Sequence, residues 1–309
     1  MWAHDATPAA STQPLIVYET IDSGGIISIW TMNSDGTEPV KHLGSQTLSG
    51  KHPVWSPDGS SIIFINNVDG SIWTMNADGS DQTELLACAD LCDEMDYPSW
   101  SPDGSKVVFL AYSDESAGPP ARSSLMTLDL KSGDLTTLAD ATLPRILDTP
   151  QWSPDGQTIV LAMNELDDEF NQTGAALATM PASGGELTWL TEFSLYAYYP
   201  TWNAVTNQIV FGQEPVLWSG ASDADTQPLN LWVINPDGAG LEAITDLAEG
   251  EALVQSAWTP DGTRIIATLM DRNGPRLVWV DPASGEITKM PTTAGNLYPR
   301  LQPVGKSPD

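Results

Sequence analysis

One short segment recurs along this chain and constrains its fold more than any other feature. It reads Pro-x-Trp-Ser-Pro-Asp-Gly, or a close variant, and its copies are 45 to 56 residues apart. A repeat of this length is typical of propellers and solenoids, in which each repeat is one unit that stacks against its neighbours. The repeated tryptophans, which we expect to pack between units, are Trp55, Trp100, Trp152, Trp202 and Trp258.

Each repeat contains four short β-rich runs. In the first complete unit, the segment ending at Trp55 is followed by apolar or alternating runs at 61–65, 72–75 and 83–86. Asp-Gly pairs at 58–59 and 78–79 separate the first run from the second and the third from the fourth. Such pairs favour tight hairpin turns, because glycine adopts a positive φ without steric cost. Four antiparallel strands form one propeller blade.

The two ends of the chain complement each other. Residues 298–303 copy residues 97–102, with Leu301 at the tryptophan position, and only a short tail follows. Residues 15–19, 27–32 and 38–43 have the pattern of a blade that lacks its first strand. We therefore predict an all-β, six-bladed propeller of four-stranded antiparallel blades, closed by pairing of the C-terminal strand with the N-terminal blade. Closure of this kind removes exposed sheet edges.

The Trp-Ser-Pro-Asp-Gly repeat and the later Met-Asn-x-Asp-Gly turns resemble the TolB-like six-bladed β-propeller family, with its degenerate WD-like repeat. The resemblance covers residues 14–303 as a single propeller, with a flexible tether at 1–13 and a short tail at 304–309. It implies a fold rather than an activity, because this ring serves as a periplasmic scaffold, as the lid of serine peptidases and as a lyase framework.

The charge balance restricts the partners. Lysine and arginine number 12 against 41 aspartate and glutamate residues, which gives a formal net charge of −29. Nucleic acids and anionic lipids require cationic patches, so we expect neither as a partner. The same acidity is also typical of salt-adapted or secreted proteins. No run of apolar residues is long enough to predict a membrane span.

The long insertions of the repeat fall on one face of the predicted ring. They are the loops between strands two and three and the connections between blades, at 88–96, 113–122, 140–148, 164–174, 213–228 and 246–254. We call this side the insertion face and the side of the short Asp-Gly turns the turn face. Function concentrates in variable loops on rigid frames. The acidic residues of the insertion face are Asp90, Asp93, Glu94, Asp96, Asp114, Glu115, Asp140, Asp148, Glu165, Asp167, Asp168, Glu169, Glu214, Asp223, Asp225, Glu249 and Glu251.

The residues just ahead of each first strand are expected to surround the mouth of the central channel. Carboxylates and aromatic side chains alternate there, which suits a basic peptide, a sugar or a cation. Each tyrosine could equally pack between blades. The predicted partner-binding residues are His52, Asp96, Tyr97, Asp148, Tyr198, Tyr199, Tyr298 and Arg300.

The cysteine pair and the N-terminus indicate export. Cys88 and Cys92 are the only cysteines, and their spacing favours a small local disulfide, which persists in oxidising compartments. Residues 6–14 are small, Pro- and Thr-rich, as in a stalk. We expect a monomer that is periplasmic, on the cell surface or secreted, without the export signal or anchor in this sequence. A disordered N-terminus on a cytosolic protein is the alternative.

Catalytic motifs are almost absent. There are three histidines, no Gly-x-Ser-x-Gly elbow and no His-Glu-x-x-His helix. No cofactor is expected; Ca²⁺ is the one metal for which the sequence offers ligands, at Asp223 and Asp225 or at 167–169. Two hypotheses remain. The first is a non-enzymatic binding or scaffold propeller for a protein or peptide; the second is a carbohydrate-active propeller with Asp96 and Asp148 as its acid–base pair.

Overall fold

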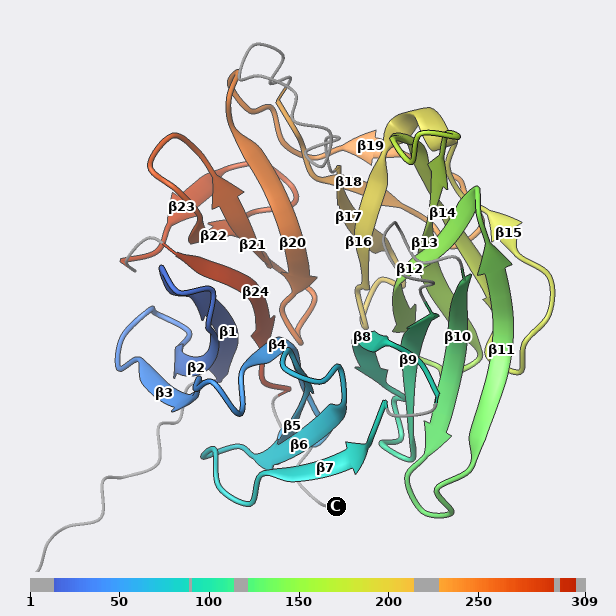
Figure 1. The fold of residues 1–309 in the computed structure, drawn as a ribbon. Helices are drawn as coiled ribbons and strands as arrows, with labels where there is room; N and C mark the ends of the chain where they lie inside the picture. Colours follow the sequence, from blue (N-terminus) through green and yellow to red (C-terminus); the bar gives the residue numbers. More distant parts are fainter. Residues whose placement is uncertain (1–13, 89–90, 114–121, 214–227, 292–294, 304–309) are drawn as a thin grey trace, which may run out of the picture.

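In the computed structural model, which describes residues 14–88, 91–113, 122–213, 228–291 and 295–303, the strands form six four-stranded antiparallel sheets arranged in a ring (Figure 1). The fold class is therefore as predicted. The first strands of the six blades surround the central channel (Figure 1). No helix of the described residues is long and apolar enough to cross a membrane.

The first three blades run as follows. Blade 1 comprises β24 (Asn296–Leu301), β1 (Leu15–Ile21), β2 (Ile27–Asn33) and β3 (Val40–Leu43). Blade 2 comprises β4 (Gly50–Trp55), β5 (Ser61–Asn66), β6 (Ile72–Asn76) and β7 (Thr83–Leu86). Blade 3 comprises β8 (Glu94–Trp100), β9 (Lys106–Ser113), β10 (Arg122–Asp129) and β11 (Leu135–Thr142).

The other three blades have shorter outer strands. Blade 4 comprises β12 (Arg145–Trp152), β13 (Thr158–Leu166), β14 (Gln172–Pro181) and β15 (Thr188–Trp189), followed by the 3₁₀ turn η1 (Phe193–Leu195). Blade 5 comprises β16 (Ala197–Trp202), β17 (Ile209–Gln213), β18 (Trp232–Ile234) and β19 (Glu242–Ala243). Blade 6 comprises β20 (Ala252–Trp258), β21 (Ile265–Met270), β22 (Arg276–Val280) and β23 (Ile287–Lys289).

The chain ends close the ring, as predicted. β24 pairs antiparallel with β1, with Leu301 opposite Ile16 and Arg300 opposite Val17. The Gln302 side-chain amide also donates to the Gly59 carbonyl of blade 2 at 2.7 Å. The C-terminal segment therefore completes blade 1 and also contacts the neighbouring blade 2.

The turn face is built from repeated hydrogen-bonded turns. In the first, the Asp58 carboxylate accepts the Ser60 N–H at 3.0 Å and the Ser56 hydroxyl at 2.6 Å. Gly59 follows with φ +71°, a conformation that other residues rarely adopt. Asp103, Asp155 and Asp261 repeat this arrangement, so these carboxylates stabilise turns.

The repeated tryptophans lie between blades. Trp55 is 4% exposed and its indole N–H donates to the Arg300 carbonyl of blade 1 at 3.2 Å. The Trp100 indole N–H reaches the Val54 carbonyl of blade 2 at 3.4 Å. Trp258 is also buried, but Trp100, Trp152 and Trp202 are half-buried, less than we expected of core residues.

The described insertions are shorter than the sequence suggested. The predicted connection at 140–148 is mostly strand, because β11 continues to Thr142 and β12 begins at Arg145. Cross-strand ion pairs extend the ladders here: Arg122 contacts Asp140 at 2.7 Å and Arg145 contacts Glu165 at 3.1 Å. The predicted tether at 1–13, the tail at 304–309, and residues 114–121 and 214–227 lie outside the described residues.

Candidate site in the central channel

Every innermost strand breaks its ladder at the same place. The pairing register shifts once in β4, β8, β12, β16, β20 and β24. At each shift one residue has a positive φ between 42° and 53°: His52, Tyr97, Thr149, Tyr199, Gln255 and Tyr298. We expected these residues just ahead of the strands. They lie inside them instead, because a β-bulge accommodates one extra residue within a continuing strand.

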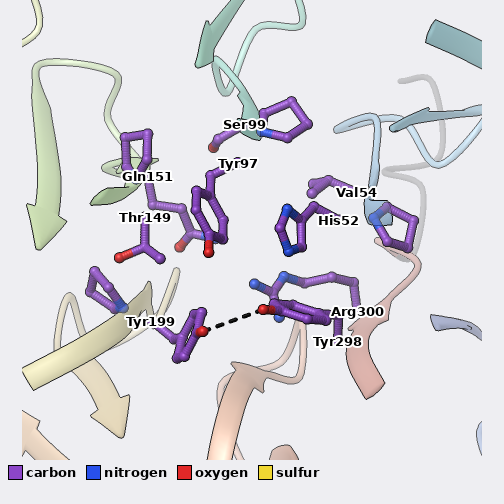
Figure 2. Close-up of a pocket in the computed structure, with 13 residues that line it drawn as sticks. His52, Val54, Tyr97, Ser99, Thr149, Gln151, Tyr199, Tyr298 and Arg300 are labelled. Atoms are coloured by element: carbon purple, nitrogen blue, oxygen red, sulfur yellow. Dashed lines mark hydrogen bonds between the residues drawn. The ribbon is translucent and has the colours of Figure 1, made fainter. Parts of the chain in front are cut away.

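The residue that follows the bulge favours a break at this place in most of the blades. Proline follows the bulge residue in five of the six blades, at positions 53, 98, 150, 200 and 299. Proline has no N–H for the ladder and is confined to edges and bulges within sheets. A positive φ at a non-glycine residue is uncommon and strained for the β-branched Thr149. The bulge turns these side chains into the channel, where five of the six line one cavity (Figure 2).

Four of the bulge residues form an aromatic layer across the channel, defined as His52, Tyr97, Tyr199 and Tyr298. The His52 ring stacks on Tyr97 with centroids 4.3 Å apart and meets Tyr298 edge-on, also at 4.3 Å. Tyr199 and Tyr298 are 5.8 Å apart, with their hydroxyls 3.3 Å from each other (Figure 2). These contacts come from four different blades, so the layer reaches across the channel.

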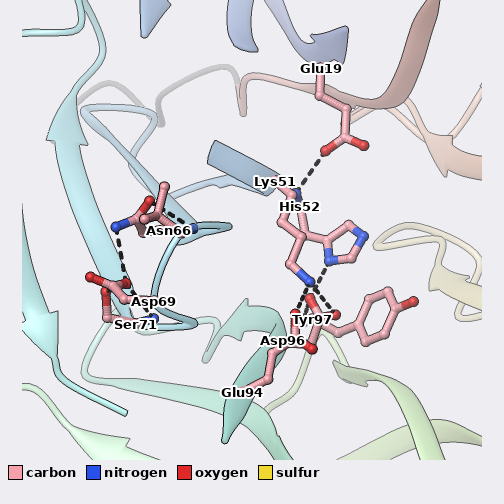
Figure 3. A network of polar contacts seen from close by, with 10 residues as sticks. Glu19, Lys51, His52, Asn66, Asp69, Ser71, Glu94, Asp96 and Tyr97 are labelled. Carbon is pink, nitrogen blue, oxygen red and sulfur yellow. Dashed lines mark hydrogen bonds and ion pairs between the residues drawn. The ribbon is translucent and has the colours of Figure 1, made fainter. Parts of the chain in front are cut away.

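A charged network, buried except for the half-exposed Glu94, surrounds Lys51 and His52 (Figure 3). Lys51, Glu94 and Asp96 precede the bulge residues of their strands and so lie on the insertion side of the aromatic layer. Lys51 bonds to both Glu94 and Asp96, the latter at 2.9 Å. The other Asp96 oxygen contacts His52 Nδ1. Glu19, on the neighbouring β1, accepts the His52 backbone N–H at 2.9 Å. Blades 1, 2 and 3 are therefore joined by one set of polar contacts.

The pKa values in this network follow from its contacts. Burial by itself would raise the pKa of Asp96, but the charges and hydrogen bonds of His52 and Lys51 lower it to about 2. Burial would lower the pKa of Lys51, yet Asp96 and Glu94 raise it above its usual value. Burial raises the pKa of Glu19 above the usual value of a glutamate, and it raises the pKa of Tyr97 well above the usual value of a tyrosine. Asp96 and Lys51 are thus a fixed ion pair at neutral pH.

The remaining predicted binding residues occupy three different places. Asp148 lies on the insertion side and accepts a hydrogen bond from Asn164 at 3.1 Å. Tyr198 is 3% exposed and packs in the core between blades 4 and 5, with its hydroxyl accepting from Gln172. Arg300 lies two residues beyond its bulge, on the turn side of the aromatic layer (Figure 2).

The calcium hypothesis concerns two acidic segments. The Asp167 carboxylate accepts the backbone N–H groups of Glu169 and Asn171, each at 2.8 Å, and so closes its own hairpin. Asp223 and Asp225 lie outside the described residues. Within the ranges that the structure describes, no three His, Cys, Asp or Glu side chains are grouped as metal ligands.

Glu19, Thr149 and Gln151 also belong to the channel but were not among the predicted binding residues, although Thr149 was expected at the channel mouth from its place ahead of a first strand. Glu19 is a single carboxylate in an otherwise apolar run, which was a usable signal. Thr149 and Gln151 lie next to Pro150 in the bulge pattern. Cys88 and Cys92 are joined by a disulfide with their Cα atoms 5.4 Å apart.

Solved structures share this fold. TolB from Acinetobacter baumannii matches with a TM-score of 0.71 and 15% identity, over 94% of this chain and 67% of that one. A TolB homologue assigned to Agrobacterium tumefaciens matches with a TM-score of 0.63 and 18% identity, over 97% and 94%. An oligogalacturonate lyase in complex with manganese matches at 0.56 and 17%, over 90% and 74%. No protein-family model matches the chain, and no curated protein matches it in sequence.

These comparisons concern architecture. The chain has the fold of TolB-like six-bladed propellers, as its repeat predicted. The same fold carries an enzyme in the lyase, so the ring is compatible with binding and with catalysis. The choice between them depends on the channel of this chain.

Proposed function

We propose that this propeller is a non-enzymatic binding scaffold that acts outside the cytoplasm and holds a basic protein or peptide on its insertion face. The observation that carries the proposal is the mouth of the channel. There the aromatic layer crosses the channel, and Glu94, Asp96 and Asp148 lie on its insertion side, where Glu94 and Asp96 already pair with the Lys51 ammonium. Aromatic rings next to carboxylates suit cationic side chains, through ion pairing and cation–π contacts.

The insertion face also carries exposed carboxylates that serve no described turn or ion pair. Asp168 and Glu169 extend from the hairpin between β13 and β14, and Glu249 precedes β20. Many acids of the turn face instead accept backbone N–H groups, as Asp58 and Asp103 do. Acids on the insertion face therefore have more capacity to meet a cationic partner.

The carbohydrate-active alternative is less well supported. It requires a group that holds its proton near neutral pH and delivers it to a leaving oxygen. The low pKa of Asp96, about 2, keeps that carboxyl ionised, and both its oxygens contact Lys51 or His52. Asp96 is thus suited to holding a network together rather than to acid catalysis.

A location outside the cytoplasm is supported by the disulfide between Cys88 and Cys92. Disulfides persist in the periplasm and in secreted proteins but are rare in the reducing cytosol. The formal net charge of −29 also favours a basic partner over nucleic acid or anionic lipid.

The proposal can be tested with paired charge variants. A library of basic peptides is screened, and the best binder is titrated by calorimetry at low and physiological salt. We expect Asp168→Asn with Glu169→Gln to weaken binding several-fold and to reduce its salt dependence, because exposed charges are screened over about 8 Å at physiological ionic strength. The matched control, Asp134→Asn with Glu286→Gln, removes the same charge from exposed positions in turns of the opposite face. Equal losses in both variants would show that bulk acidity alone attracts the peptide.

A further inference from the structure

The turn side of the aromatic layer contains a cationic cavity that the proposed function does not use. It has a volume of about 40 Å³ and is lined by bulge residues and by residues that follow them in five of the six innermost strands, those of blades 1 to 5. That volume accommodates roughly three water-sized groups. It is therefore large enough for one small oxyanion group but too small for a sugar ring.

Arg300 supplies the positive charge of this cavity. Its guanidinium extends from β24 toward the middle of the ring of bulge residues (Figure 2). Arg300 forms no ion pair with any carboxylate in the described part of the chain, and one of its NH₂ groups donates to the Pro299 carbonyl at 2.9 Å. Its Nε–H is inaccessible to solvent and has no hydrogen-bond partner among the described residues. The charge of the buried Glu19 acts on Arg300, but the two side chains form no ion pair among the described contacts.

A second buried polar group belongs to a residue that lines the same cavity. Thr149 is 6% exposed and lines the cavity, and its hydroxyl oxygen has no hydrogen-bond partner among the described residues. Buried polar groups are almost always hydrogen-bonded, and leaving one unpaired is costly. Gln151 lines the cavity as well: its side-chain oxygen accepts the Trp202 N–H at 3.4 Å, and the described contacts leave its NH₂ group to donate elsewhere. The cavity thus combines a guanidinium, a hydroxyl and an amide from two blades.

We propose that this cavity binds a carboxylate group, with Arg300 as its charged ligand and Thr149 and Gln151 as hydrogen-bond donors. Guanidinium presents two parallel N–H groups that match the two oxygens of a carboxylate. Ser99 and the tyrosine hydroxyls of the aromatic layer complete the polar wall. The carboxylate belongs either to a free small acid or to the end of a peptide chain that reaches in from the turn side. This site is independent of the proposed partner surface, which lies on the other side of the aromatic layer.

The test uses acetate as the probe and the full chain as the protein. Thermal unfolding is followed in sodium acetate and in sodium chloride at equal ionic strength, and acetate binding is measured by calorimetry. We expect acetate, but not chloride, to raise the melting temperature, because a ligand that binds only the folded state stabilises it by mass action. Arg300→Gln should abolish this difference. The control, Arg272→Gln, removes the same charge from an exposed position and should behave like the wild type.

Two further variants keep the test decisive if Arg300→Gln does not fold. Thr149→Val keeps the β-branched shape and removes only the hydroxyl, so it should weaken acetate binding several-fold. Arg300→Lys keeps the positive charge but lacks the two parallel N–H groups of a guanidinium, so it should bind acetate more weakly than the wild type. Peptides with free and amidated C-termini distinguish the sources: tighter binding of the free peptide than of acetate identifies a chain end, and the reverse identifies a small acid. Equal effects of acetate and chloride on the wild type, or unchanged acetate binding in the Arg300 and Thr149 variants, would overturn the assignment.

Discussion

Glu19 and Asp96 are both buried carboxyl groups of one polar network, yet their pKa values move in opposite directions. Burial is the largest influence on each. Asp96 contacts two basic side chains, Lys51 and His52, which outweigh the burial and lower its pKa. The Glu19 carboxyl accepts the backbone N–H of His52, and burial prevails. Contact with a cation therefore decides whether the pKa of a buried acid in this channel is lowered or raised.

This difference predicts the acid sensitivity of the protein. The pKa of Asp96 is about 2 when folded and 3.8 in its unperturbed state, so Asp96 stabilises the fold above pH 3.8 and loses that contribution as the pH falls toward 2. The lost stability is about 2 kcal/mol, at roughly 1.4 kcal/mol for each unit of pKa. Urea denaturation at several pH values should show that Asp96→Asn is destabilised at pH 6 and approaches the wild type near pH 2. A constant difference at every pH would show that the contribution of Asp96 does not depend on its charge.

Part of the channel could be predicted from the sequence at the level of residues. The proline after each bulge residue marked the positions of His52, Tyr97, Tyr199 and Tyr298, which the structure brings together. Their role in binding a partner stays a prediction. The separation of Arg300 from Asp96 by the aromatic layer was not predictable, because Asp96 precedes its bulge residue, Arg300 follows its own, and the bulges themselves were not predicted.

At the scale of the strand, the six bulges are the most informative elements. Each one interrupts an innermost strand at the same height, so a four-residue aromatic layer arises from segments 45 residues or more apart. Bulges re-aim side chains and are enriched near functional sites. Alternation of apolar residues predicts strands but not an irregularity within them, which is why the channel residues were expected ahead of the strands.

The connection between β7 and β8 carries a testable covalent link. Cys92 lies two residues before Glu94, which bonds to Lys51. Non-reducing peptide mapping should recover Cys88 and Cys92 as one linked pair, and reduction should lower the free energy of unfolding by about 2 kcal/mol in the chain-entropy estimate for so short a loop. The double variant Cys88→Ser with Cys92→Ser is the control, since a reductant should not change its stability. Recovery of two alkylatable thiols from protein purified from its native source would contradict the linkage and weaken the proposed location.

For the whole molecule, the repeat was sufficient to predict the number of blades, the order of strands and the closure of the ring. The Trp segment and the Asp-Gly turns mark each blade in the sequence, and both depend on local sequence alone. The lengths of the insertions were less predictable. The described strands of blades 3 and 4 extend into the predicted loops through the ion pairs of Arg122 and Arg145, which are contacts between distant residues.

Because the single strand β24 closes the ring, we predict that truncation at the C-terminal end strongly destabilises the propeller. Deletion of residues 296–309 removes β24, exposes the edge of β1 and leaves the Trp55 indole without the Arg300 carbonyl. An exposed strand edge promotes aggregation, and β1 contributes Ile16 and Val17, both 0% exposed, to the core. We therefore expect the truncated chain to aggregate or to unfold at a much lower temperature, as followed by circular dichroism and size-exclusion chromatography. Deletion of residues 304–309 alone leaves every described strand intact and should be neutral. If both truncated chains melt like the full-length protein, the pairing of β24 with β1 contributes little to holding the ring together.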